Sequence, residues 1–357
     1  MRHLIWFELK KTLSVRKLIV LSAAIVVLCR AIFVFIQFQA DYEYIKDVQN
    51  QYAGVVTDGA VAESVARYEE LLEIDKTVGL SHQQKEEFLS LETPVWLNRC
   101  DEVRKERLAE YGITPSTIVI GDTISYGFME NFISRFFPLI ICFIISFLIG
   151  PVFTTEYENK MDGLLLATKN GKRKVIISKL FASFIITILA HIVIIMVFMI
   201  QTIAAYGIGD LDASFVFTAG DPFTYITSPF DYTVLQYVIV MLAVSLLGCI
   251  GYCVFALFIS SKCKHSAVSS MICMAIAFVP FLTYLTVGNE QAPITNILRF
   301  TYSQIISVRT LCSTYCTVSI GNFEFQSVYL SLLLLCVLSV GFTILTYRTF
   351  RSHQVEN

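Results

Sequence analysis

Six long apolar runs constrain the fold of this 357-residue chain more than any other feature. A helix needs about 20 apolar residues to cross a bilayer, and it satisfies its backbone polar groups within the segment. The runs cover residues 18–38, 132–153, 180–205, 234–259, 267–287 and 328–347. The sequence therefore predicts an all-α membrane protein with six transmembrane helices.

Basic residues are distributed unevenly among the connections between these runs. Lys and Arg gather before residue 18, within 154–179, in the "SSKCKHS" link after the fourth run and in the tail 348–357. The loop 206–233 has neither, although it carries four Asp. Because short connections rich in Lys and Arg stay on the cytoplasmic side, we expect both termini and the connection 154–179 to be cytoplasmic.

Residues 1–17 have their own pattern. Leu4, Ile5, Leu9 and Leu13 recur at near-helical spacing, with Lys and Arg beside them, and no continuous apolar core of a cleavable signal is present. A helix of this kind lies in the headgroup layer before the chain turns into the first span. We therefore expect an amphipathic interfacial helix that contacts membrane lipid.

The connection 39–131 is long and acidic, with 18 Asp and Glu against 8 Lys and Arg. Val61, Val65, Tyr68 and Leu72 fall on one helical face. A second helix is expected between Pro94 and Gly112, the residues at its limits. The prediction is a helix-rich extracellular insert. Two interpretations of its charge stay open: a solvated outer domain, or a surface that attracts a cationic peptide or a partner protein.

The chain shows no catalytic or metal-binding pattern. Gly171 and Lys172 suggest a phosphate loop, but Leu166 stands where the first Gly is required and Arg173 follows the Lys. No His or Cys spacing matches a zinc site, and the near-neutral net charge of −2 gives no sign of nucleic-acid binding. Most of the ten Cys lie in apolar runs, where they pack as small apolar residues. A disulfide between Cys312 and Cys316 stays open.

The connection after the second run carries the most ordered polar pattern, "EYENKMDGLLLATKNGKRKVIISKL". It contains two acids, a Gly, an apolar turn, a Gly-centred basic turn and a Lys at the start of the next helix. Apolar residues between basic ones suit docking into a groove on a partner protein. Anchoring of the basic residues to anionic lipid is the alternative. The residues are Glu156, Glu158, Gly163, Leu164, Leu165, Leu166, Gly171, Lys172, Arg173, Lys174 and Lys179.

This pattern resembles the coupling hairpin of type-2 permease subunits of exporter-type bacterial ABC transporters. The resemblance extends to the N-terminal helix, the six spans and the "SSKCKHSAV" link, and the long insert resembles that of some Gram-positive permeases. Leu164 replaces the usual small residue, and the basic turn reads Gly-Lys-Arg rather than Gly-Arg.

The resemblance implies a multi-pass permease in a bacterial cell membrane that exports a substrate. It also implies a separate ATP-binding-cassette ATPase that docks on the hairpin and holds ATP and Mg, so that this chain is not itself an enzyme. A second permease chain, identical or homologous, would complete the transporter. The alternative from another class is a receptor or immunity protein, whose insert binds a ligand such as a cationic peptide without transport.

Two polar residues lie within predicted spans. Arg30 in the first span either snorkels to the outer interface, lines a transport path or binds an anionic headgroup. His191 in the third span is either a hydrogen-bonded structural residue or part of that path. The fourth span carries small residues that permit close helix contacts and offer a face to the second chain, namely Ser245, Gly248, Gly251 and Ala256.

Overall fold

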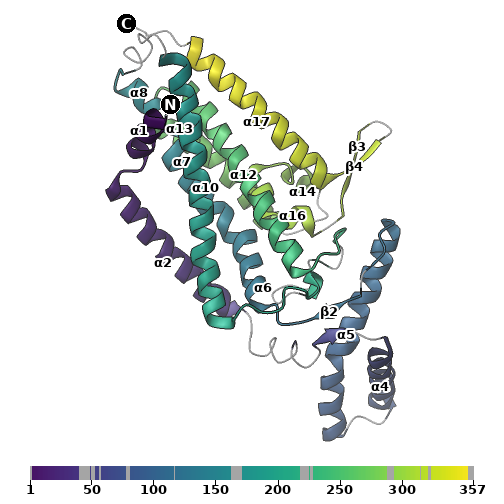
Figure 1. Ribbon diagram of the computed structural model, residues 1–357. Coiled ribbons are helices and arrows are strands. Elements are labelled where there is room, and N and C mark those ends of the chain that lie inside the picture. The colour runs from purple at the N-terminus through teal and green to yellow at the C-terminus, as the bar shows by residue number, and fades with distance from the viewer. Residues whose placement is uncertain are drawn as a thin grey trace.

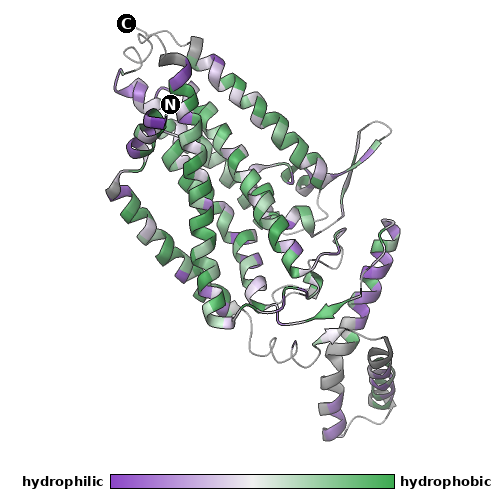
Figure 2. Ribbon diagram, viewed as in Figure 1, coloured by the Kyte–Doolittle hydropathy of each residue, from purple (hydrophilic) through white to green (hydrophobic). Residues whose placement is uncertain are grey.

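The fold is that of an all-α membrane protein. The computed structural model describes residues 2–39, 49, 53–55, 58–77, 81–115, 117–161, 171–217, 225, 228–287, 293–313, 315–320 and 323–352. Within these ranges, six helical segments are long and apolar enough to cross a membrane. They form one bundle with both termini at the same end, called here the basic end (Figure 1). Figure 2 shows that the bundle helices are mainly hydrophobic along their length.

The six spans match the predicted runs. They are α2 (Val15–Gln39), a composite second span, α10 (Gly171–Tyr206), α12 (Val234–Lys262), α13 (Ser266–Val287) and α17 (Ser327–Ser352). The second span joins α6 (Ile124–Asn131), a π-helical turn (Phe132–Phe136), α7 (Phe137–Ile149) and α8 (Thr154–Glu158). It therefore begins at Ile124, whereas the apolar run predicted a start at residue 132, and all of α6 is buried.

Helix α12 lies at the centre of the bundle. Its start is fixed by a capping box, in which the Thr233 hydroxyl accepts from the Gln236 amide while the Gln236 side chain accepts from the Thr233 amide. Gly248 lies against Ile306, and Gly251 lies against Leu335 of α17. The close contacts predicted for the fourth span are therefore confirmed, but they are made within this chain. The expectation that these glycines face a second chain was wrong.

The connection between α13 and α17 returns into the bundle rather than staying outside it. It forms α14 (Pro293–Leu298), α15 (Tyr302–Ser307), α16 (Arg309–Cys312) and an antiparallel hairpin of β3 (Thr317–Ile320) with β4 (Phe323–Gln326). Helix α15 packs against α12 and α7 and is buried from Ser303 to Ser307. Cys312 and Cys316 are free thiols, the former buried, so the disulfide left open by the sequence is not formed.

The insert contains two long helices and projects from the end of the bundle opposite the termini (Figure 1). Helix α4 (Asp58–Thr77) confirms the helix predicted around Val65 and Tyr68. Helix α5 (His82–Glu110) ends before Gly112, as predicted, and Gly112 takes the left-handed φ of 70°. Its start was predicted wrongly. A capping box at Ser81 begins the helix, and Pro94 lies in its interior.

The insert is tied to the bundle by polar contacts. Arg104, 1% exposed, donates to Asp231 at 2.7 Å just before α12. Strand β1 (Gly54–Val55) pairs with β2 (Val119–Ile120), and the amide and carbonyl of Val119 bond to Ser214 of the connection after α10. These contacts make the insert a folded projection with a fixed attachment.

Residues 1–17 contain α1 (Arg2–Thr12), separated from α2 by a break at residues 13–14. Leu4, Ile5 and Leu9 are partly buried, while Trp6 and Phe7 are exposed. Helix α1 packs along the start of α10. One side of α1 therefore faces the bundle, and Glu8 on that side is buried.

Candidate coupling site

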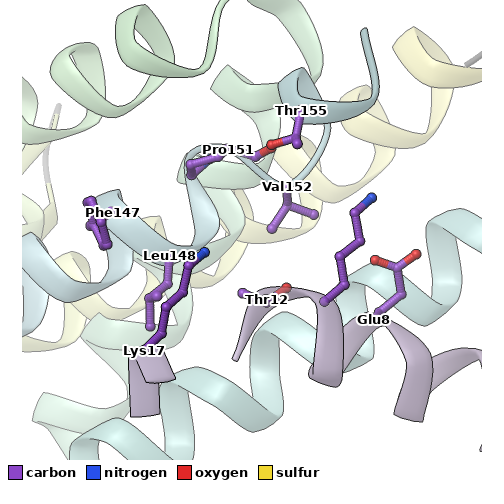
Figure 3. A pocket seen from close by; sticks show the side chains of 9 residues that line it. Glu8, Thr12, Lys17, Phe147, Leu148, Pro151, Val152 and Thr155 are labelled. Carbon is purple, nitrogen blue, oxygen red and sulfur yellow. The ribbon is translucent and has the colours of Figure 1, made fainter. Parts of the chain in front are cut away.

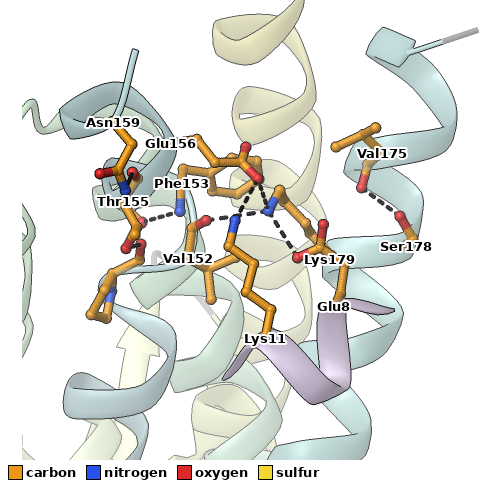
Figure 4. Close-up of polar contacts among 12 residues, drawn as sticks. Glu8, Lys11, Val152, Phe153, Thr155, Glu156, Asn159, Val175, Ser178 and Lys179 are labelled. Carbon is orange, nitrogen blue, oxygen red and sulfur yellow. Dashed lines mark hydrogen bonds and ion pairs between the residues drawn. The ribbon is translucent and has the colours of Figure 1, made fainter. Parts of the chain in front are cut away.

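The acidic residues that the sequence analysis singled out lie in α8, at the basic end of the bundle, close to α1 and α10 (Figure 4). Pro151 and the turn after it redirect the chain from α7 into α8. The short helix that follows places Glu156 on the inner side and Glu158 on the outer side, with 3% and 35% of their side chains exposed. Two acids separated by one residue thus meet different partners.

Glu156 belongs to a network of four charges, of which Glu156, Glu8 and Lys179 are buried and Lys11 is partly exposed. The Lys179 ammonium lies 2.6 Å from Glu156 Oε1 and 3.0 Å from Glu8 Oε2, and it also donates to the Val152 carbonyl at 3.3 Å. Lys11 donates to the same Glu156 oxygen at 3.0 Å. Figure 4 shows these side chains converging from α1, α8 and α10. Two positive and two negative charges compensate one another, as burial of ions requires.

The network depends on local features of each helix. Glu8 follows Leu4 and Ile5 by four and three residues, which places it on the apolar side of α1. Helix α10 begins at Gly171, so Lys179 lies two turns inside it and none of its side chain is exposed. The ammonium also lies 5.7 Å from the centre of the Phe153 ring. The predicted role of Lys179 as the residue that opens the third span is thus corrected.

Glu158 caps the next helix. Its carboxylate accepts from the Ser266 amide at 2.8 Å and from the Ser266 hydroxyl at 2.8 Å and 3.0 Å, at the start of α13. A carboxylate at a helix N-terminus satisfies an unpaired amide and interacts favourably with the helix dipole. His265 Nδ1 lies 3.8 Å away. Glu158 therefore joins α8 to α13.

The same segment contacts two more spans. The Phe153 amide donates to the Ser260 hydroxyl of α12 at 3.0 Å, and the Phe153 ring lies 5.2 Å from that of Phe350 on α17. Residues 153–158, called here the hub segment, thus contact α1, α10, α12, α13 and α17. A displacement of this segment has to move or break contacts with four spans and the N-terminal helix.

Part of the predicted hairpin lies outside the described residues, namely Gly163, Leu164, Leu165 and Leu166. Gly171 and Lys172 form the first turn of α10 rather than a separate basic turn, and Arg173 and Lys174 on the same turn are exposed. The exposed cations therefore stand where α10 leaves the hairpin.

The two residues proposed for a transport path have different environments. His191 is buried, with Nε2 3.1 Å from the Ser245 hydroxyl and its ring edge-on to Phe137. Arg30 is exposed on α2, with its guanidinium carbon 5.4 Å from the centre of the Phe33 ring. His191 is thus packed and hydrogen-bonded within the bundle, whereas Arg30 lies on its surface, and a part of either residue in a transport path stays a prediction.

Sequence reasoning missed two buried acids. Glu8 was overlooked, although its spacing from Leu4 and Ile5 places it on the apolar side of α1. Glu130, assigned to the insert, is buried in α6, accepts from the Tyr225 hydroxyl at 2.7 Å and lies 3.8 Å from Arg309. No local sequence pattern marks Glu130 as buried, because its partners Tyr225 and Arg309 are distant in sequence. Among the described residues, no group of His, Cys, Asp and Glu is arranged to hold a metal ion.

Comparison with known proteins identifies the family. No curated protein and no solved structure matches the chain. The family model described as "ABC-2 family transporter protein" matches residues 2–355, almost the whole length. The six spans, the amphipathic N-terminal segment and the hub segment all lie inside the match. The chain belongs to the ABC-2 family of transporter proteins and is a multi-pass membrane permease subunit.

Proposed function

We propose that this chain exports a substrate from a bacterial cell, using ATP hydrolysed by a separate ATP-binding-cassette subunit that docks at the basic end. In this proposal the basic end and both termini are cytoplasmic, in agreement with the Lys and Arg distribution. A second permease chain, identical or homologous, completes the substrate path. The observation that carries the proposal is the hub segment, which joins the connection 159–170 to α1 and four spans.

The hub segment suits force transmission because its contacts resist separation. Separating Lys179 from Glu156 inside the protein leaves uncompensated buried charges, which is strongly unfavourable. Helices α1, α8 and α10 therefore move as one body when the hairpin is displaced. Glu156 and Lys179 influence a docked ATPase through these helices and not by contact, because their side chains are buried.

Docking itself falls to the residues around the hairpin. Arg173 and Lys174 are exposed and carry charge that orients a partner. The apolar residues 164–166 supply the contact area, of which a few central residues carry about 2 kcal/mol or more each. Loss of one such residue lowers affinity by roughly 30-fold.

The test is copurification of the ATPase subunit with affinity-tagged chain from native membranes, quantified by mass spectrometry. Leu165→Asp and Leu166→Asp place a charge in the docking groove and should abolish copurification, while membrane insertion remains intact. Arg173→Glu should weaken it, more so at low salt. Lys262→Glu is the matched control, because Lys262 is exposed at the basic end on another connection.

Anchoring of the hairpin to anionic lipid gives the opposite ranking. It predicts that Arg173→Glu and Lys262→Glu act alike. It also predicts that the Leu changes have little effect on ATPase copurification. Undiminished ATPase recovery with the Leu165→Asp and Leu166→Asp proteins would refute docking at this hairpin.

A further inference from the structure

A pocket lies beside the hub segment, where α1 joins α2 and both face the end of α7 (Figure 3). Its volume is about 460 Å³, which includes its opening to the outside. Lys11, Lys17 and Thr12 supply polar groups to its wall, and Phe147, Leu148 and Val152 supply apolar ones. The pocket is therefore amphipathic, and it lies at the basic end of the first and second spans.

The charges around the pocket leave one cation unused. Glu8 also lines the pocket, but its carboxylate pairs with Lys179 at 3.0 Å. Lys11 pairs with Glu156 at 3.0 Å, and 34% of its side chain is exposed. Among the described residues, the Lys17 ammonium has no ion-pair or hydrogen-bond partner, and the residue is exposed. In Figure 3 the Lys17 side chain extends toward Leu148. The pocket thus carries a net positive charge available to an anion.

The rim of the pocket continues into the apolar surface of the bundle. Phe147 is 56% exposed, and Phe143 one turn before it is 48% exposed with its ring 6.3 Å away. On the other side, Leu18 begins the exposed apolar face of α2. In a membrane-spanning bundle, surfaces of this kind face acyl chains. A ligand of the pocket therefore has an anionic end beside Lys17 and an apolar end along Phe147 and Phe143.

We propose that this pocket binds the headgroup phosphate of an anionic phospholipid. Lys17 contributes the main charge, Lys11 a second, shared ammonium, and Thr12 a hydroxyl donor, while the acyl chains lie along Phe147. A free phosphate would contact the same polar groups but not the apolar rim. A lipid would contact both, so the lipid explains more features of the pocket. The bound lipid holds the joint between α1 and α2 against α7. The inference goes beyond the proposed function and is independent of any ATPase.

The test is native mass spectrometry of the full chain in detergent, titrated with dioleoylphosphatidylglycerol or dioleoylphosphatidylcholine. The wild type should bind the phosphatidylglycerol in preference. Lys17→Gln should weaken the first binding event about tenfold, the size of one charge-assisted contact. Lys17→Arg should restore it. Lys10→Gln is the matched control, because Lys10 lies at the same end of the bundle on α1, over Trp6 and outside the pocket, and its replacement should leave binding unchanged.

Three outcomes overturn the proposal. Equal losses of lipid affinity in the Lys17→Gln and Lys10→Gln proteins would show that anionic headgroups are attracted to the whole basic end and not to this pocket. Equal binding of both lipids would show that the pocket does not select a headgroup with net negative charge, because both lipids carry a phosphate and only the phosphatidylglycerol is anionic. Displacement of the lipid by millimolar glycerol phosphate would assign the pocket to a free phosphate compound. The thermal midpoint of each variant shows whether it is folded, and Lys17 is exposed enough for its replacements to fold.

Discussion

Replacing Lys179 by methionine tests whether the buried network holds the basic end together. The Lys179 ammonium is fully buried, 2.6 Å from Glu156 and 3.0 Å from Glu8. At an effective dielectric of about 20, the closer pair attracts by roughly 6 kcal/mol, against a desolvation cost of several kcal/mol per ion. The variant loses the attraction and leaves two buried carboxylates with Lys11 as their remaining cation in the network. We expect the free energy of unfolding to fall by about 3–5 kcal/mol.

The design is a double-mutant cycle with Glu156→Gln. The double variant keeps Glu8 and Lys11, whose charges compensate. Its loss of unfolding free energy should therefore be smaller than the sum of the losses in the two single variants. A coupling energy of about 2–3 kcal/mol is expected for groups in direct contact. Lys174→Met is the matched control, since Lys174 is exposed on the same helix, and it should stay within about 0.5 kcal/mol of the wild type.

The measurement is unfolding by sodium dodecyl sulfate in mixed micelles. The chain has two Trp, and replacing Trp96 by Phe leaves Trp6 on α1 as the fluorescent reporter. Release of α1 should precede global unfolding in the Lys179→Met protein. A loss below about 1 kcal/mol, or strictly additive single effects, would refute the network as a stabilising unit.

Three further predictions concern other parts of the fold. Gly248→Ala should destabilise by about 1–3 kcal/mol, because its Cβ would lie 2.8 Å from Ile306, whereas Gly341→Ala, with open space around it, should be neutral in the same unfolding assay. Burial raises the pKa of the Cys312 thiol to about 12, so only about 1 in 10⁴ molecules carries the reactive thiolate at pH 8. Cys263, between α12 and α13, is also partly exposed, so the test uses a Cys263→Ser background. Maleimide labelling of the connection between α13 and α17 should there be lost in Cys316→Ser and kept in Cys312→Ser. Arg104→Gln removes the buried bond to Asp231 and should speed hydrogen exchange at the end of α5, whereas Arg107→Gln, whose partner Glu110 is on the same exposed turn, should not.

The sequence alone was sufficient for the spans, because an apolar run of this length has one low-energy environment. It also predicted α4 and the end of α5, since a helical stripe and a Gly at a left-handed position act over a few residues. Local sequence signals predicted the starts of α5 and α10 wrongly. The capping box at Ser81 began α5 well before Pro94. Helix α10 starts at Gly171, before its long apolar run, and Val175 and Ile176 in this first part are buried against the rest of the protein.

The tertiary structure decided the partners of the charged residues. "EYEN" predicts two acids at the end of a span, but nothing within it assigns Glu156 to Lys179 and Glu158 to Ser266. Lys11 and Glu156 are 145 residues apart in sequence, and Glu8 and Lys179 are 171 apart. Likewise, the burial of α15 depends on Gly248 leaving room beside α12. Periodicity fixes which side of a helix is apolar, whereas the pairing of charges depends on which helices pack together, and that is set by the whole bundle.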